Sequence, residues 1–158
     1  MLLRTHIAIS LLGILALFSL FPEFLEWSIF VAAVLLGGIF PDIDCETSKL
    51  GRRGIFRPFQ FFMKHRGFFH SFTFVFILAV LGWIFLESFR EEIVFGVAGG
   101  YGLHLIADSF TKKGVRPFVP FSKIRFKGKI RSGGKKEIVI FSVIVGIDII
   151  LIILDFFK

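Results

Sequence analysis

Cysteine and charged side chains are both scarce in this sequence. The 158 residues contain one cysteine, Cys45, which excludes an internal disulfide and permits a reduced, cytosol-facing position. Charged residues make up 20% of the chain, hydrophobic residues make up 55%, and the mean hydropathy is +0.82. This composition excludes an ordinary soluble domain and indicates an integral membrane protein, with residues 1–158 as a single membrane domain.

Five apolar stretches are long enough to cross a bilayer, which takes about 20 helical residues within a range of roughly 17–25. They cover residues 5–21, 24–40, 68–86, 93–110 and 138–157. We expect the first to be retained as a helix, because no small-residue cleavage site precedes Pro22. The predicted fold class is therefore an all-α integral membrane protein, a compact bundle of about five transmembrane helices.

The connections between these stretches alternate in charge. Together with Arg4, the loops 41–67 and 111–136 hold 17 of the 19 basic residues. The links at 22–23 and 87–92 are acidic. The positive-inside rule makes the basic side the cytoplasm, so we expect a cytoplasmic N-terminus and a C-terminus on the other side of the cell (inner) membrane.

Both basic loops carry patterns that suit a membrane surface. Residues 55–64 mix four phenylalanines with cations, which is typical of an interfacial segment, although a loop anchored by its aromatic rings explains the same pattern. Residues 123–131 alternate polar and apolar residues about Gly128, which predicts a small β-hairpin with a basic face toward anionic lipid headgroups. Because topology already explains the basic charge, we expect no specific nucleic-acid partner.

Histidine and aspartate gather at one predicted membrane depth. The residues on the cytoplasmic side of the bundle are His6, Asp42, Asp44, His65, His70, His104 and Asp108. They come from four helices, and they include all four histidines of the chain. Scattered, solvated histidines would have no reason to avoid the other side of the membrane, so this convergence indicates a functional site.

The clearest pair within this group is His104 and Asp108. Their four-residue spacing places an imidazole and a carboxylate on one helix face, and both are ordinary ligands for Zn, Mn or Fe. A capping carboxylate beside a hydrogen-bonded histidine explains the pair as well, and the other members could be turn formers or interfacial residues. Taken as a set, we predict six metal ligands, namely His6, Asp42, Asp44, His70, His104 and Asp108.

Seven candidate donors exceed the three or four of a single zinc site, so one or two divalent transition-metal ions are predicted. His65 and His70 lie about 140° apart around a helix, which favours His70 as the ligand and gives His65 an acid/base role. We predict His65 and Arg66 as catalytic, and Arg53, Arg66 and Lys112 as contacts for a substrate phosphate. The alternative is that these cations only set the topology.

The predicted function is a metal-dependent hydrolase at the cytoplasmic membrane interface, acting on a phosphorylated or ester-linked membrane lipid through a metal-activated water. Such a water needs no protein nucleophile, and Ser71, Ser109 and Thr111 could each be a cap. Asp148, near the middle of the last apolar stretch, favours a metal or ion transporter or sensor instead. A membrane scaffold that binds a regulatory protein through loop 111–136 also stays open, as does a homodimer.

Five segments occur in an order that resembles the YdjM-like family. They are Thr5-His6, Gly38–Asp44, Ser48–Arg53, His65–Ser71 and Gly102–Gly114. This family comprises inner-membrane proteins described as metal-dependent hydrolases, and it also carries a LexA-binding or LexA-regulated label. The resemblance covers roughly residues 5–122 and implies a membrane-bound metal-dependent hydrolase. It matches the family's polar positions to a set of seven residues: His6, Asp42, Asp44, His65, His70, His104 and Asp108. The family pattern often has histidine where this chain has Cys45.

Overall fold

The computed structural model describes residues 1–17, 24–44 and 68–156. These residues form five α-helices and a 3₁₀ segment but no β-sheet, which confirms the predicted all-α fold. The helices are α1 (Leu3–Ala16), α2 (Phe24–Ile39), α4 (Phe72–Phe85), α5 (Arg90–Ser109) and α6 (Lys135–Phe156), and the 3₁₀ segment η2 (Phe40–Asp44) follows α2.

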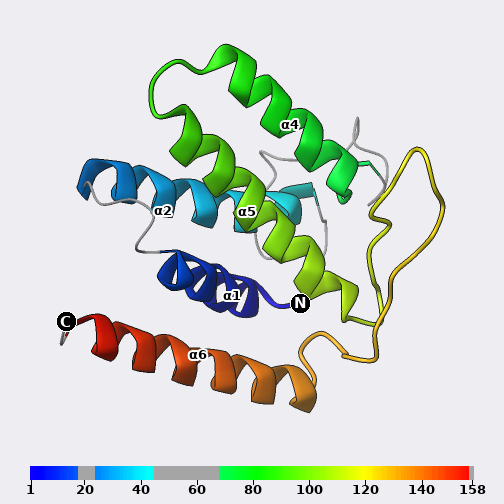
Figure 1. Ribbon diagram of the computed structural model, residues 1–158. Coiled ribbons are helices and arrows are strands. Elements are labelled where there is room, and N and C mark those ends of the chain that lie inside the picture. Colours follow the sequence, from blue (N-terminus) through cyan, green and yellow to red (C-terminus); the bar gives the residue numbers. More distant parts are fainter. Residues whose placement is uncertain (18–23, 45–67, 157–158) are drawn as a thin grey trace.

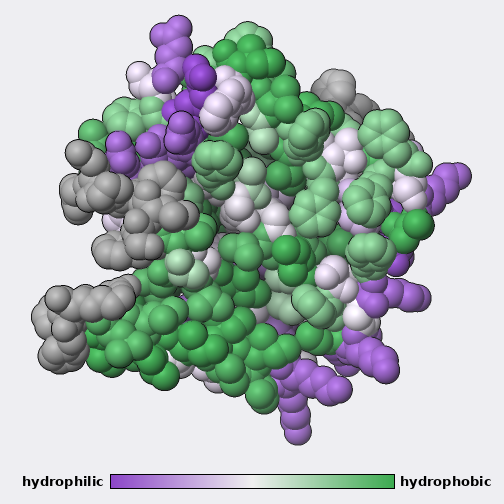
Figure 2. Space-filling model, viewed as in Figure 1, coloured by the Kyte–Doolittle hydropathy of each residue, from purple (hydrophilic) through white to green (hydrophobic). Residues whose placement is uncertain are grey.

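Within the described ranges, two stretches are long and apolar enough to cross a membrane, namely Leu25–Asp42 and Lys135–Leu154. Helices α1 and α4 are also apolar, but each has 14 described residues. Hydrophobic side chains cover most of α6, whereas hydrophilic side chains gather toward two ends of the molecule (Figure 2). An apolar belt between polar ends is the surface expected of a membrane protein.

The contact between α2 and α5 is built on glycine. A Cβ added at Gly100 would lie 2.0 Å from the carbonyl oxygen of Val34, and one at Gly37 would lie 2.3 Å from that of Val97. No side chain fits at such distances, so the two backbones touch. Small residues allow this close approach of helices inside a membrane. The same approach brings the end of α2 within reach of polar side chains on α5.

Helices α1 and α6 lie side by side, and α1 also contacts α2 and α5 (Figure 1). The start of α1, the start of α6 and the end of α5 all come to the same end of the molecule (Figure 1). Three segments that are distant in sequence therefore meet there, and this meeting positions the candidate site.

The loop between α5 and α6 does not form the hairpin predicted about Gly128. Two isolated bridges instead join its two arms, pairing Val115 with Phe126 and Thr111 with Ile130. The backbone N–H of Gly128 donates to Thr111 O at 2.9 Å, and a Cβ at Gly128 would lie 2.1 Å from a carbonyl oxygen of the other arm. The glycine therefore permits a close approach between the arms and makes no turn. The alternation in 123–131 reflects pairing with the residues that directly follow α5.

Candidate metal centre

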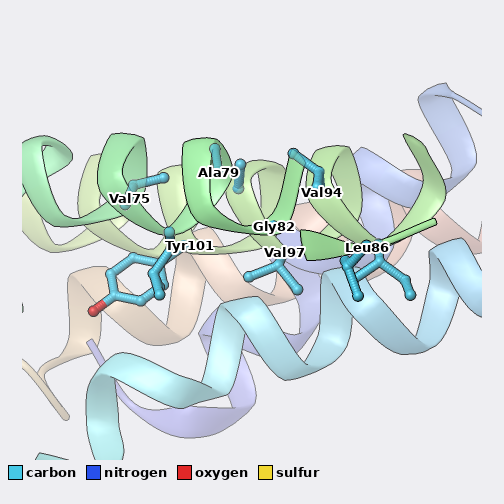
Figure 3. Close-up of a pocket in the computed structure, with 10 residues that line it drawn as sticks. Val75, Ala79, Gly82, Leu86, Val94, Val97 and Tyr101 are labelled. Carbon is cyan, nitrogen blue, oxygen red and sulfur yellow. The ribbon is translucent and has the colours of Figure 1, made fainter. Parts of the chain in front are cut away.

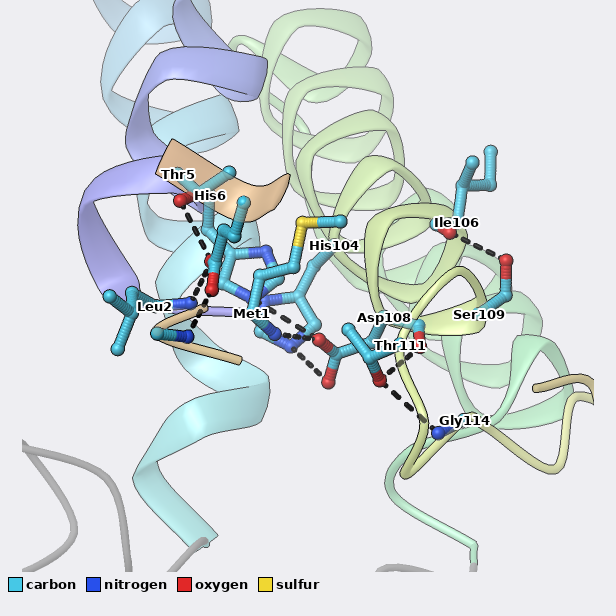
Figure 4. Close-up of polar contacts among 12 residues, drawn as sticks. Met1, Leu2, Thr5, His6, His104, Ile106, Asp108, Ser109, Thr111 and Gly114 are labelled. Carbon is cyan, nitrogen blue, oxygen red and sulfur yellow. Dashed lines mark hydrogen bonds and ion pairs between the residues drawn. The ribbon is translucent and has the colours of Figure 1, made fainter. Parts of the chain in front are cut away.

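His6, His104 and Asp108 lie together where α1 begins and α5 ends (Figure 4). One ligand atom from each lies within 4.8 Å of the others. Zinc holds nitrogen and oxygen ligands at about 2.0–2.2 Å, so the ligand atoms around one tetrahedral ion are about 3.4 Å apart. Side-chain shifts of about an ångström would therefore close the three residues, which we call the triad, around a single ion.

The two histidines of the triad are buried and Asp108 is partly buried, and the imidazole nitrogens face the carboxylate oxygens. His6 and His104 are each 1% exposed, and their rings stack with centroids 3.8 Å apart. The distance from His6 Nε2 to Asp108 Oδ1 is 3.5 Å, and that from His104 Nε2 to Asp108 Oδ2 is 3.9 Å. Within the described residues neither Nε2 makes a hydrogen bond. Buried polar atoms in proteins nearly always have partners, so two unsatisfied imidazole nitrogens beside a carboxylate fit a metal ion.

Gly38 determines which nitrogen of His104 faces the carboxylate. Its carbonyl oxygen lies 2.8 Å from His104 Nδ1. A carbonyl only accepts, so Nδ1 carries the hydrogen, and Nε2 of the neutral ring keeps a lone pair toward Asp108. Metal-binding histidines are commonly oriented in this way by a backbone carbonyl. A Cβ at Gly38 would lie 2.4 Å from Ser10 Oγ, so only glycine fits here without a shift.

Two further predicted ligands lie beside the triad. The His70 ring centroid is 5.5 Å from that of His104, and the two ring planes meet at 73°. Asp42, in η2, interacts electrostatically with His6, His70 and Asp108. The structure thus brings together donors from α1, η2, α5 and the segment before α4.

His70 precedes α4, although the predicted apolar stretch 68–86 placed it within the first turn of a helix. The helix begins at Phe72, and Ser71 is its N-cap, accepting a hydrogen bond from the backbone N–H three residues later at 3.2 Å. The Tyr101 hydroxyl donates to the carbonyl oxygen of Phe69. Hydrogen bonds to the residues on both sides of His70, Phe69 and Ser71, therefore hold this segment in place beside α5.

Three hydroxyls near the site are engaged locally. Ser71 donates to Phe68 O at 2.5 Å, Ser109 donates to Ile106 O at 2.6 Å, and Thr111 donates to Asp108 O at 2.7 Å. These contacts fit structural roles at helix ends. They supply no activating base of the kind that a hydroxyl nucleophile needs.

The remaining predicted site residues are placed differently. Asp44 is the last residue of η2, and Lys112 is exposed, with its backbone N–H donating to Ile130 O at 2.8 Å. The residues Cys45, Arg53, His65 and Arg66 lie outside the described ranges. The predicted catalytic pair and most of the phosphate contacts therefore stay predictions.

Glu137 is the site residue that sequence reasoning missed. Its side chain is 0% exposed and accepts hydrogen bonds from Leu2 N at 2.6 Å, Thr5 Oγ1 at 2.9 Å and Gly133 N at 2.5 Å. The amino group of Met1 also forms an ion pair with Asp108. Apart from the Gly133 hydrogen bond, these contacts join residues over a hundred positions apart, so no local spacing in the sequence predicts them. The only sequence signal is an acidic residue at the start of an apolar stretch, where it complements the helix dipole.

An apolar groove runs between α4 and α5 (Figure 3). Its volume is about 120 Å³, and its walls come from Val75, Leu78, Ala79, Gly82, Leu86, Ile93, Val94, Val97, Ala98 and Tyr101. Tyr101 stands at one end of the groove and precedes His104 by three residues, about one helical turn. The groove therefore ends close to the triad.

The part of the chain that the structure describes is thus an all-helical protein with two candidate membrane-spanning helices and a His–His–Asp group that could hold a metal ion. The chain belongs to the YdjM inner membrane protein family, whose family model matches residues 1–156. It is 34% identical over 95 residues to the inner membrane protein YdjM of Escherichia coli (strain K12) and to that of Shigella flexneri. The match covers 57% of this chain and 48% of each relative, so it spans about half the length of these proteins. No solved structure matches the chain.

Proposed function

We propose that this protein is a metal-dependent hydrolase of the inner membrane, which acts on a phosphorylated or ester-linked lipid from the cytoplasmic side. The observation that carries the proposal is the buried triad, in which the Nε2 atoms of His6 and His104 face the two oxygens of Asp108. Imidazole and carboxylate donors suit Zn, Mn or Fe. Three protein ligands leave one position of a tetrahedral site open, as in catalytic metal sites.

The residues around the triad have distinct roles in this proposal. A bound metal supplies a Lewis acid and an activated water. Gly38 keeps the lone pair of His104 Nε2 directed at the site, and Asp42 and His70 offer donors for a second ion. The local hydrogen bonds of the nearby hydroxyls favour water over a protein nucleophile. We assign acid/base chemistry to His65 and Arg66 and phosphate binding to Arg53, Arg66 and Lys112.

A lipid substrate is supported by the groove between α4 and α5. Its walls are apolar, and it ends at Tyr101, one helical turn from His104. An acyl chain in the groove would place its headgroup near the triad. In the proposed topology all five helices cross the membrane, and the basic loop 111–136 lies in the cytoplasm. The triad then lies at the depth of the cytoplasmic headgroups.

Metal content and lipid turnover of the detergent-purified protein test this proposal. We expect one or two equivalents of a transition metal in the wild type, loss of metal in His104→Ala, and partial or complete loss in Asp42→Ala. Ser109→Ala is the matched control, because its hydroxyl bonds only to Ile106 O among the described residues. Phosphate or fatty-acid release from vesicles should require the same metal. A wild type that binds no metal after reconstitution with Zn, Mn and Fe would exclude the hydrolase.

Asp148 favours one second candidate, a metal or ion transporter. It is 3% exposed, and within the described residues its Oδ1 has no hydrogen-bond partner. It lies about 16 Å along α6 from Glu137, far from either end of the helix. A transporter would lose metal uptake into proteoliposomes in Asp148→Asn. A hydrolase would keep its turnover in that variant.

A further inference from the structure

We infer that Glu137 is a positioning residue for the candidate metal centre, which holds the first turn of α1 on α6 and so keeps His6 stacked on His104. This inference rests on the proposed function, because it treats His6 as a metal ligand. It assigns a role to a buried carboxylate that is not itself one of the donors of the triad.

The two histidines of the triad are held in different ways. His104 is oriented through its own ring, since Nδ1 bonds to Gly38 O at 2.8 Å. His6 lacks such a backbone partner: its Nε2 faces Asp108 Oδ1 at 3.5 Å, and within the described residues its Nδ1 makes no hydrogen bond. Metal-binding histidines usually have a partner on the second nitrogen that fixes the ring. The position of His6 therefore depends on the backbone that carries it.

Glu137 holds that backbone. Its Oε1 accepts hydrogen bonds from the N–H of Leu2, the N-cap of α1, and from the hydroxyl of Thr5, the residue before His6. Within the described residues no side chain of α1 caps its own N-terminus, so the carboxylate of another helix takes that place. Its Oε2 accepts from Gly133 N at 2.5 Å, which ties the same carboxylate to the loop before α6.

All three hydrogen bonds of Glu137 run from a donor to the carboxylate, so a substitution that removes one bond can be paired with a control that keeps it. Glu137→Gln replaces one acceptor oxygen with an NH₂ group that faces a donor. Thr5→Val removes one of the hydrogen bonds with little change in shape, whereas Thr5→Ser keeps the hydroxyl. Phe141→Leu is the interface control, since it removes the contact of Arg4 with the Phe141 ring at 5.2 Å and leaves the carboxylate untouched.

The experiment is a Co²⁺ titration of the purified full chain in detergent, followed by visible absorption. We expect Glu137→Gln and Thr5→Val to weaken Co²⁺ binding by about 10–100-fold, the usual effect of losing a group that orients a ligand. Thr5→Ser and Phe141→Leu should bind like the wild type. The Co²⁺ spectrum of Glu137→Gln should shift toward that of His6→Ala. If Glu137→Gln fails to fold, the Thr5 pair tests the inference alone.

A double-mutant cycle separates positioning from general stability. In a His6→Ala background, Glu137→Gln should cost no further Co²⁺ affinity, because its effect passes through His6. Equal losses in both backgrounds would overturn the inference, and so would wild-type affinity in Glu137→Gln. In these two cases the wild type still binds Co²⁺, so the metal centre stands. A wild type that binds no Co²⁺ would overturn the metal centre, and the inference with it.

Discussion

The α2–α5 pair and the α1–α6 pair of this bundle are joined by opposite means. Glycines bring α2 and α5 into backbone contact, with positions where an added Cβ would lie only 2.0 Å or 2.3 Å from a carbonyl oxygen. Polar and cation–π contacts within their first two turns join α1 to α6, and α6 keeps many large apolar side chains exposed along its length. The first pair carries His104 and Asp108, whereas the second carries His6.

This difference suggests that the candidate centre has a rigid half and an adjustable half. Backbone contact between α2 and α5 fixes the carbonyl of Gly38 relative to His104, and tightly packed interfaces resist deformation. The start of α1, which carries His6, is held by hydrogen bonds to the Glu137 carboxylate and by the ion pair of the Met1 amino group with Asp108. A metal ion could therefore close the triad by moving α1 while α5 stays in place.

The largest effect is expected from breaking the rigid half. Gly100→Leu would drive a side chain into the α2 backbone, and we expect a loss of about 3 kcal/mol in the free energy of unfolding, the upper end of the usual cost of overpacking. Gly99→Leu is the control, since no described atom lies within 4 Å of a Cβ at that neighbouring position. Thermal unfolding in detergent measures both. Equal stability of the two variants would contradict the packing of α2 against α5.

The next effect concerns the carboxylate shared by the two histidines. Asp108→Asn keeps the shape of the side chain but removes the charge that faces both Nε2 atoms. We expect metal affinity to fall by more than the roughly 10–100-fold that follows loss of an orienting partner. Equilibrium dialysis with Zn²⁺ measures this. Retention of wild-type affinity would exclude Asp108 as a ligand.

A smaller loss is expected from disturbing the orientation of His104. Gly38→Ala places a methyl group 2.4 Å from Ser10 Oγ, so either that hydroxyl or the backbone has to shift, and we expect a backbone shift to move the carbonyl that orients the His104 ring. We expect metal binding to weaken by about tenfold, at the low end of such effects. The double variant Gly38→Ala/Ser10→Ala removes the hydroxyl, so it should recover part of the affinity. No recovery would mean that the clash is not the cause.

The smallest effect should come from the α1–α6 contact that avoids the carboxylate. Phe141→Leu removes the Arg4 cation–π contact, which is worth about 0.5–1 kcal/mol at an exposed site. The free energy of unfolding in detergent should fall by no more than that amount, and the metal affinity should stay unchanged. A large loss of metal would show that any weakening of the α1–α6 interface displaces His6.

The all-α fold class and the pairing of His104 with Asp108 could be predicted because each depends on local patterns. Apolar length and the alternation of basic and acidic loops predict helices and their ends, and a four-residue spacing places His104 and Asp108 on one face. The start of α4 was predicted too early, because Ser71 provides a cap that hydropathy does not detect. The alternation in 123–131 predicted a hairpin, yet its residues pair with a segment beyond the pattern.

The sequence by itself determined that this chain is helical and rich in long apolar segments, and that His104 and Asp108 share one helix face, because periodicity and spacing act over a few neighbouring residues. Only the tertiary structure decided that the Gly38 carbonyl orients His104, that the His6 and His104 rings stack, and that Glu137 holds the start of α1. Those contacts join residues that lie between 66 and 135 positions apart in the sequence. Their geometry follows from how closely the helix backbones approach, which no local pattern encodes.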